Sequence, residues 1–133
     1  MHPGINGPKY KDKPAIIMAS SGDIVTHAEL DKISNQGAHL FRSLGIKAGD
    51  SIAFMMENDK LFFSISAAAY RSGLKYTAIS WRLQPNEVEY ILKDCVAKLF
   101  ITSKFLEESA ESLASEIPDV KKLMINGTSQ SFS

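Results

Sequence analysis

The fold is decided by the stretch Arg71-Ser-Gly-Leu-Lys-Tyr-Thr-Ala-Ile-Ser-Trp-Arg-Leu83, which is followed after Gln84 by Pro85-Asn-Glu-Val-Glu-Tyr-Ile-Leu-Lys-Asp-Cys95. Gly73 stands where a helix needs a left-handed C-cap, and the β-prone run 75–80 predicts a buried strand after it. Pro85 then suits the first position of a new helix, with acidic residues in its first turn. The stretch therefore predicts a helix end, a strand, a polar turn and a second helix.

The turn in this stretch, residues 81–84, is a favoured place for a ligand. Loops that leave the carboxyl end of a strand and precede a helix are where open α/β sheets bind their ligands. Trp81 and Arg82 are the side chains that follow the predicted strand directly. They are therefore the candidate binding residues.

Signals upstream of this stretch predict a hairpin and two helices. Residues 15–19 and 24–25 are expected to form a short hairpin closed at Ser20-Ser21-Gly22-Asp23. Thr26 and Glu29 match a capping box, whose loss costs about 1 kcal/mol. The helix that they open is expected to bury an apolar stripe and to stop at Gly45; the expected stripe is Leu30, Ile33, Gly37, Leu40 or Phe41, and Leu44.

The rest of the chain continues to alternate strands and helices. A strand at 51–56 and an almost wholly apolar helix at 60–72 precede the opening stretch. After the helix that starts at Pro85 come a strand at 98–102, a helix capped by Ser103 and a strand at 122–125. This order predicts an α/β fold: a doubly wound, mainly parallel sheet with helices on both faces and a small amino-terminal β-hairpin. We expect 1–13 to be a flexible lead-in, 14–128 the folded part and 129–133 a tail.

Composition restricts the class of protein. The 133 residues are 44% hydrophobic, and 15 basic side chains balance 15 acidic ones, which argues against a nucleic-acid partner. One cysteine and a start without a signal-peptide pattern favour the cytoplasm. The longest nearly apolar run, 61–70, is about half the length of a transmembrane segment, so none is expected.

Five short segments in this order resemble a known family: Val25-Thr-His-Ala-Glu-Leu30, Ser34-Asn35, 45–50, Glu57-Asn58 and 71–83. The chain resembles the amino-terminal part of the adenylate-forming, AMP-binding acyl-CoA synthetases over about 14–125. Trp81-Arg82-Leu83 and Glu87-Val-Glu-Tyr-Ile-Leu92 look most like fatty-acid or aryl-acid CoA ligases.

The resemblance implies a ligase that uses ATP and Mg²⁺ to form an acyl-adenylate, which the thiol of coenzyme A then converts to a thioester. The family's Gly-rich phosphate loop, its Tyr-Gly-x-Thr-Glu motif, its ribose-binding Asp and its catalytic Lys would all fall after Ser133. We therefore expect an incomplete part of a larger domain, with no catalytic residue and no metal ligand of its own. Ser20-Ser21-Gly22 looks like the start of a phosphate loop, but Asp23 would repel a phosphate, so a plain hairpin turn is expected.

The resemblance also gives Arg82 a role, because the matching arginine contacts the nucleotide phosphate of coenzyme A in some of these ligases. The alternative is a solvated arginine paired with Glu87 or Glu89. Trp81 either stacks on an adenine or lines the coenzyme channel, or it packs as an anchor, which is the favoured interpretation.

Other candidates have simpler interpretations. Phe62, Phe63 and Tyr70 are expected in the core, and Cys95 as a small buried residue. His2, His27 and His39 are scattered, and the glutamates 107, 108, 111 and 116 form a solvated helix face.

Two other classes of function stay open. One is a free-standing module that binds coenzyme A or a nucleotide. The other is a dimerising interaction domain, because an incomplete sheet exposes an edge and apolar surface; we expect a homo-oligomer on that ground.

Overall fold

A computed structural model describes residues 3–133, which divide into two compact units. Among the described residues the first unit comprises 3–48 and 58–74, and the second comprises 49–57 and 75–133. No helix within 3–133 has both the length and the apolar character that spanning a bilayer requires.

The first unit consists of three helices and a hairpin. The hairpin strands β1 (Pro14–Ile17) and β2 (Ile24–Thr26) pair antiparallel, as predicted. Thr26 and Glu29 form the predicted capping box at the start of α2 (His27–Ser43), and Gly45 takes the predicted left-handed conformation beyond its end. Within the predicted lead-in, α1 (Pro3–Asn6) is followed by backbone-bonded turns up to residue 13.

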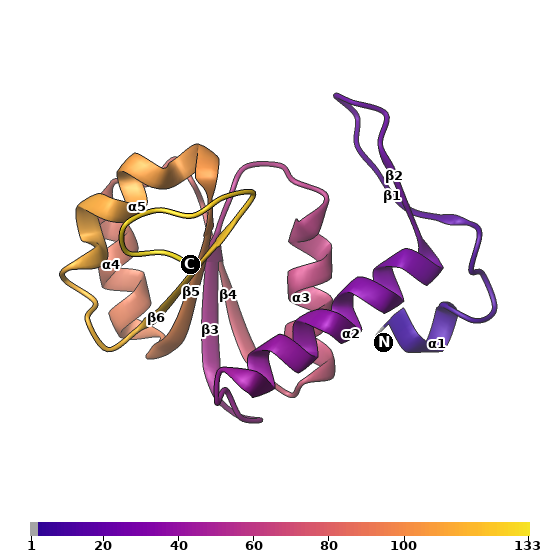
Figure 1. The fold of residues 1–133 in the computed structure, drawn as a ribbon, viewed down its shortest axis with the longest axis horizontal. Coiled ribbons are helices and arrows are strands. Elements are labelled where there is room, and N and C mark those ends of the chain that lie inside the picture. The colour runs from indigo at the N-terminus through magenta and orange to yellow at the C-terminus, as the bar shows by residue number, and fades with distance from the viewer. Residues whose placement is uncertain (1–2) are drawn as a thin grey trace. The chain divides into compact units, whose positions relative to one another are not determined.

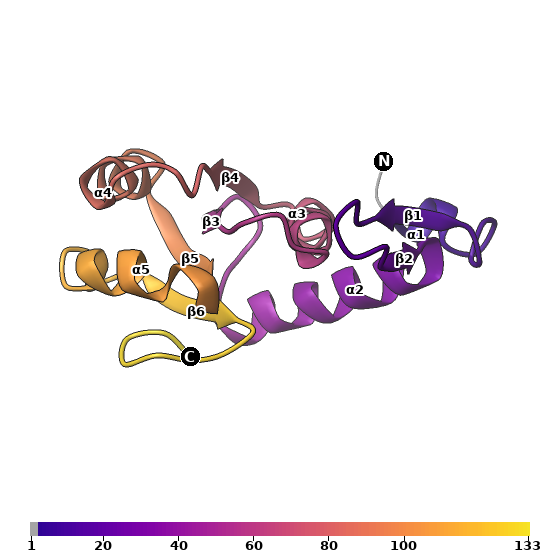
Figure 2. The same ribbon diagram turned by 90° about the horizontal axis from the view of Figure 1, so that it is seen from above.

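Helices α2 and α3 (Leu61–Arg71) pack side by side in this unit (Figure 2). A Cβ atom on Gly37 would lie 2.8 Å from the Cβ of Ala68, so the two backbones approach closely because Gly37 lacks a side chain. At the end of α3, Nη1 of Arg71 donates to the backbone oxygen of Asp31, to its carboxylate at 3.0 Å and to Oγ of Ser34 at 2.9 Å.

This packing corrects two sequence-based expectations. The fully buried residues of α2 are Ser34, Ala38 and Phe41, so of the predicted stripe Phe41 is confirmed as buried, whereas Leu40 is exposed. Small and polar residues line the contact because close helix packing and the Arg71 bonds select them. Phe63 and Tyr70 are exposed rather than in the core, so the apolar character of α3 does not measure its burial.

The second unit is a four-stranded parallel sheet in the order β4-β3-β5-β6. Its elements along the chain are β3 (Ser51–Met55), β4 (Lys75–Ile79), α4 (Pro85–Asp94), β5 (Ala97–Ser103), the 3₁₀ helix η1 (Lys104–Leu106), α5 (Glu107–Ala114) and β6 (Lys121–Ile125). The predicted doubly wound, parallel α/β class is confirmed, since the strand order reverses direction around β3 as in such folds.

The core of the second unit lies where α4 and α5 cover one side of the sheet (Figure 1). Val88 and Leu92 of α4 and Ala110 and Leu113 of α5 are buried, at the helical spacing expected from the sequence. The side chains of β3 and β5 that point to the other face, among them Phe54 and Leu99, are buried as well. Both faces of the two central strands are therefore shielded from water.

Two local expectations in this unit were wrong. β4 is an edge strand with mostly exposed side chains, because within the described chain it pairs with β3 alone. Ser103 does not cap a helix through its side chain: η1 intervenes before α5, and the Ser103 hydroxyl bonds elsewhere.

The segment 126–133 folds back beside α5 and β6 (Figure 1). Phe132 is 1% exposed and meets Phe100 edge to face, while Met124 N–H donates to the Ser133 carbonyl at 2.7 Å. The carboxylate of Glu111 accepts from the Ser129 hydroxyl and from both the hydroxyl and the backbone N–H of Ser131. These bonds, that of Ser129 first, lower the pKa of Glu111 below its usual range. Glu111 is therefore a structural acceptor rather than part of a solvated face.

Candidate functional site

The point where the strand order reverses lies between β3 and β5 in the second unit. Open α/β sheets bind ligands outside the carboxyl ends of their strands at such a point. Glu57 follows β3 there, and Ser103 ends β5 fully buried, with its hydroxyl bonded to Oε2 of Glu57. Sequence reasoning missed this pair; the available signal was a polar residue directly after each of the two predicted strands, 51–56 and 98–102.

Trp81 and Arg82 stand at the same edge of the sheet, in the turn after β4. The turn is closed by a bond from Leu83 N–H to the Ser80 carbonyl at 3.2 Å. Pro85 begins α4, and Gln84 forms a capping box with Glu87, so a well-defined helix start holds the turn in place. The guanidinium carbon of Arg82 lies 5.3 Å from the centroid of the Trp81 ring, a cation–π distance.

Arg82 does not form an ion pair with Glu87 or Glu89, the acidic partners considered from the sequence. Glu87 accepts the backbone N–H of Gln84 at 2.8 Å, and Glu89 pairs with Lys93 at 2.6 Å. Among the described residues no ion pair involves Arg82. Its charge is thus available to an anion, which an arginine binds through directed, often bidentate hydrogen bonds.

An open groove runs between this turn and α5. It has a volume of about 660 Å³, and α5 contributes Glu108, Ser109 and Ser112 to its wall. Trp81 is 39% exposed at its border and touches Phe105 of η1 edge to face, with ring centroids 6.2 Å apart. The carboxyl edge therefore combines a cation, aromatic rings and hydroxyl groups.

The turn at Ser20-Ser21-Gly22 in the first unit does not fit a phosphate. Gly22 N–H donates to the Met18 carbonyl at 2.8 Å, and Asp23 N–H donates to the Ser21 hydroxyl at 3.2 Å. Because these donors are already used inside the turn and Asp23 is anionic, the turn offers no anion cradle. The hairpin interpretation is the one the geometry supports.

The remaining candidates within 3–133 do not line the groove beside Trp81 and Arg82. Nη2 of Arg42 donates to Nδ1 of His39 at 3.1 Å, His27 lies near Tyr10, and His2 lies outside the described residues. Cys95 is half-buried against the core, with Sγ 3.7 Å from the Leu92 carbonyl. Within 3–133 no three His, Cys, Asp or Glu side chains gather as metal ligands would.

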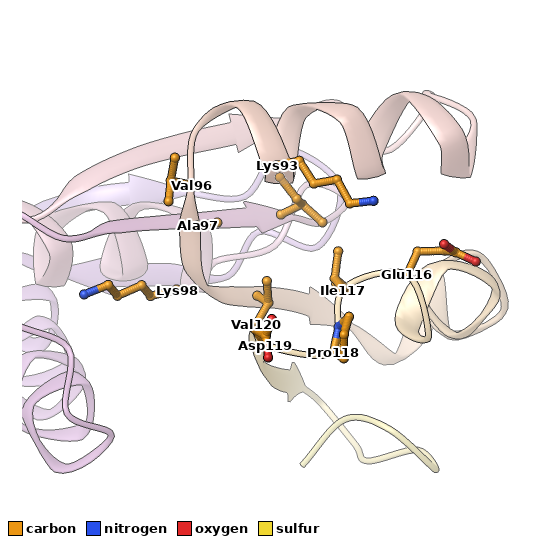
Figure 3. A pocket seen from close by; sticks show the side chains of 10 residues that line it. Lys93, Val96, Ala97, Lys98, Glu116, Ile117, Pro118, Asp119 and Val120 are labelled. Atoms are coloured by element: carbon orange, nitrogen blue, oxygen red, sulfur yellow. The ribbon is translucent and has the colours of Figure 1, made fainter.

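A second pocket, of about 340 Å³, lies at the amino edge of the same sheet, between the connections that precede β5 and β6 (Figure 3). Lys93 and Lys98 on its border are already paired, with Glu89 and Asp50. This edge is opposite to the one at which open α/β sheets bind ligands. We therefore place the candidate site at the carboxyl edge.

The chain belongs to the family of AMP-binding enzymes, whose model matches residues 6–131. The resemblance inferred from the sequence is confirmed by this match.

Similar proteins include several acid–CoA ligases. The chain is 24% identical over 119 residues to the 3-hydroxybenzoate–CoA ligase of Aromatoleum sp. (strain CIB), which covers 90% of the chain and 22% of that protein. It is 34% identical over 97 residues to the crotonobetaine/carnitine–CoA ligase of Shigella flexneri serotype 5b (strain 8401), covering 71% and 19%. The chain thus spans about a fifth of the length of these relatives.

Solved structures share the fold. The N-terminal domain of FACL13 from Mycobacterium tuberculosis matches with a TM-score of 0.82 at 23% identity, covering 89% of this chain and 31% of that one.

Proposed function

We propose that the chain is the amino-terminal portion of an ATP-dependent acid–thiol ligase that acts through an acyl-adenylate. Family membership and the likeness to acid–CoA ligases support this role. The contribution of this chain is inferred from Arg82. This residue is a cation at the carboxyl edge of the sheet and has no acidic partner among 3–133. The acid substrate is a fatty or aryl acid, and the compartment is the cytoplasm.

In this proposal the chain supplies scaffold and one side of the coenzyme A entrance. Arg82 fits the nucleotide phosphate of coenzyme A, because a guanidinium binds phosphate oxygens through charge-assisted bonds. Trp81 borders the same surface. The turn at Ser20-Ser21-Gly22 uses its own donors internally, so it contributes no phosphate contact to this role. Residues 14–128 are the folded subdomain that performs this supporting role.

The proposal is tested first by ATP–pyrophosphate exchange with a panel of carboxylic acids. The chain by itself is expected to give no exchange above background, because it spans about a fifth of the length of the ligases it resembles and its proposed role is supporting. Exchange by the purified chain would contradict the proposal that this chain has only a supporting role in the ligase. A coding sequence that continues past Ser133 into a Thr/Ser-Gly-Thr-Thr-Gly-x-Pro-Lys type loop would support it.

Arg82→Ala tests the coenzyme contact in a ligase that carries this chain. The Michaelis constant for coenzyme A should rise roughly tenfold or more, because a charge-assisted hydrogen bond contributes about 1.5 to 3 kcal/mol. The constant for ATP should stay nearly unchanged. Equal effects on the two constants would show that Arg82 supports the fold rather than the coenzyme.

A second candidate function is self-association, which the exposed edge of β4 favours. Its outer side has no strand partner within 3–133, and Lys75, Tyr76 and Ala78 are exposed. A free-standing module that binds coenzyme A is the remaining alternative. Tight binding of coenzyme A by the isolated chain would favour the module, and a millimolar affinity would favour the ligase portion.

A further inference from the structure

The pocket at the amino edge of the sheet in the second unit has no part in the proposed ligase role. It lies between the connection from α4 to β5 and the connection from α5 to β6, which meet because β5 and β6 are neighbours in the sheet (Figure 3). Its volume of about 340 Å³ is at the lower end of the range of small-molecule sites. The pocket therefore has room for a compact ligand.

The floor of the pocket is apolar. Leu92 near the end of α4, Ala97 at the start of β5 and Ile117 after α5 are 1%, 6% and 3% exposed, so they are shared with the core. Val96 forms part of the border and is 72% exposed. Covering this apolar border and floor with an apolar ligand is favourable, because it removes apolar surface from water.

The wall formed by residues 117–120 is a preformed turn. Val120 N–H donates to the Ile117 carbonyl at 3.2 Å. Nζ of Lys122 donates to the carbonyls of Ile117 and Val120, at 2.7 Å and 2.8 Å, and so holds the turn from behind. Pro118 suits the second position of such a turn because its φ is already fixed. A ligand would bind without first ordering this wall, which lowers the entropic cost of binding.

Two carboxylates border the pocket on the connection from α5 to β6. Among 3–133 neither Glu116 nor Asp119 forms an ion pair. The pKa of Lys93 is raised, first by its hydrogen bond to Glu89 and also by the charge of Glu116. The negative charge of Glu116 therefore acts on the side of the pocket that α4 forms.

The two lysines of the border do not make the pocket a site for an anion. Lys93 is bound to Glu89 at 2.6 Å. Lys98 is bound to Asp50 at 2.7 Å, and its side chain extends away from Ile117 (Figure 3). Each lysine is thus balanced by its own acidic partner, and the charge that remains on the lining residues is negative.

We propose that this pocket is an accessory binding site for a small apolar amine. The ammonium group lies beside Glu116 and Asp119, and the apolar body of the amine covers the floor. An ammonium complements this border because it is a cation that donates hydrogen bonds, and carboxylates accept them. A protein partner fits less well, because charged residues surround the pocket and the centres of protein interfaces are depleted of them.

The test follows the backbone N–H signals of residues 96–98, 116–117 and 119–120 in the ¹⁵N-labelled chain while hexylamine is added at neutral pH. Hexanol and hexanoate carry the same apolar body with a neutral or a negative head, and they are titrated in parallel. Hexylamine should shift these signals in a saturable way, with a Kd roughly threefold to tenfold below that of hexanol, since exposed ion pairs are weak. Hexanoate should bind more weakly than hexanol. The indole signal of Trp81, at the opposite edge of the sheet, should not move.

Variants separate the charge contact from the apolar contact. The double variant Glu116→Gln/Asp119→Asn changes exposed side chains and should weaken hexylamine roughly threefold to tenfold, while hexanol is unaffected. Glu108→Gln is the matched control, because Glu108 is an exposed carboxylate of α5 that lines the other groove. Val96→Asn removes the apolar border at a φ of 52°, which asparagine tolerates, and should weaken hexylamine and hexanol alike.

Several results would overturn the proposal. Hexanoate that binds as tightly as hexylamine would exclude a site for a cation. The absence of a saturable response to hexylamine would exclude the site, and equal shifts at Trp81 would show non-specific binding only. A saturable response to acetyl-leucyl-lysinamide without one to hexylamine would assign the pocket to a protein partner instead. None of these results involves Arg82, so the proposed ligase role is tested separately.

Discussion

Val96 holds a backbone conformation that β-branched residues rarely adopt. Its φ is 52°, directly after the end of α4, where helices commonly place a glycine. Its side chain is 72% exposed, so packing compensates little for the strain. Nothing in the sequence pattern signalled this, because the strain follows from where α4 stops relative to β5.

We expect Val96→Gly to raise the free energy of unfolding by about 1 kcal/mol, since a left-handed L-residue costs about 1 to 2 kcal/mol and glycine costs less. The measurement is chemical denaturation. Asn126→Gly is the matched control: Asn126 also has a positive φ, of 62°, but asparagine tolerates it, so the change should stay within about 0.5 kcal/mol. A loss of stability in Val96→Gly would mean that the side chain packs in solution.

Local sequence signals predicted some residue roles and missed others. Thr26 and Glu29 were identified as a capping box because both partners lie on one helical turn. The bond between Ser103 and Glu57 joins residues far apart in the chain, so spacing could not reveal it. Arg82 was placed correctly at a strand end, but its lack of an acidic partner depended on where Glu87 and Glu89 point.

At the scale of elements, the contact of α2 with α3 depends on Gly37. Gly37→Ala would bring two Cβ atoms to 2.8 Å, and overpacking of this kind costs about 1 to 3 kcal/mol against a helix-propensity gain of about 1. We expect a net loss of roughly 1 kcal/mol in chemical denaturation.

Ala68→Gly should compensate this loss in the double variant, because it removes the opposing Cβ atom. Additive losses in the double variant would show that Gly37 is needed for a reason other than the close approach.

The segment 126–133 is tied to α5 through Glu111, which makes its attachment dependent on pH. The folded pKa of Glu111 lies below the usual 4.5, so its stabilisation is present above that value and is lost as the pH falls through the lowered pKa. Glu111→Gln should therefore lower the denaturation midpoint at about pH 7 and have a smaller effect at about pH 3.

Glu116→Gln is the control for this prediction, since Glu116 is exposed and accepts none of these bonds. The same pH dependence in both variants would exclude Glu111 as the group that holds the segment.

At the scale of the whole molecule, the free edge of β4 predicts concentration-dependent association. Strand edges without a partner promote pairing between chains, and a lysine placed on the edge suppresses it. Sedimentation should reveal dimers or larger species that Ala78→Lys reduces. Lys98, on the central strand β5, already carries a charge and is paired with Asp50, so Lys98→Ala should leave the association unchanged. A monomer at all concentrations would contradict self-association.

The sequence by itself determined the alternation of strands and helices, the parallel α/β class, the hairpin and the Thr26 cap. These follow from periodicity and from short-range signals, which depend on neighbouring residues alone.

Only the tertiary structure decided that β4 lies at an edge, that α2 buries small and polar residues, and that Phe105 joins Trp81 and Arg82. Each of these depends on which distant segments become neighbours. The strand order places β3 between β4 and β5, so side chains separated in the chain meet at one end of the sheet.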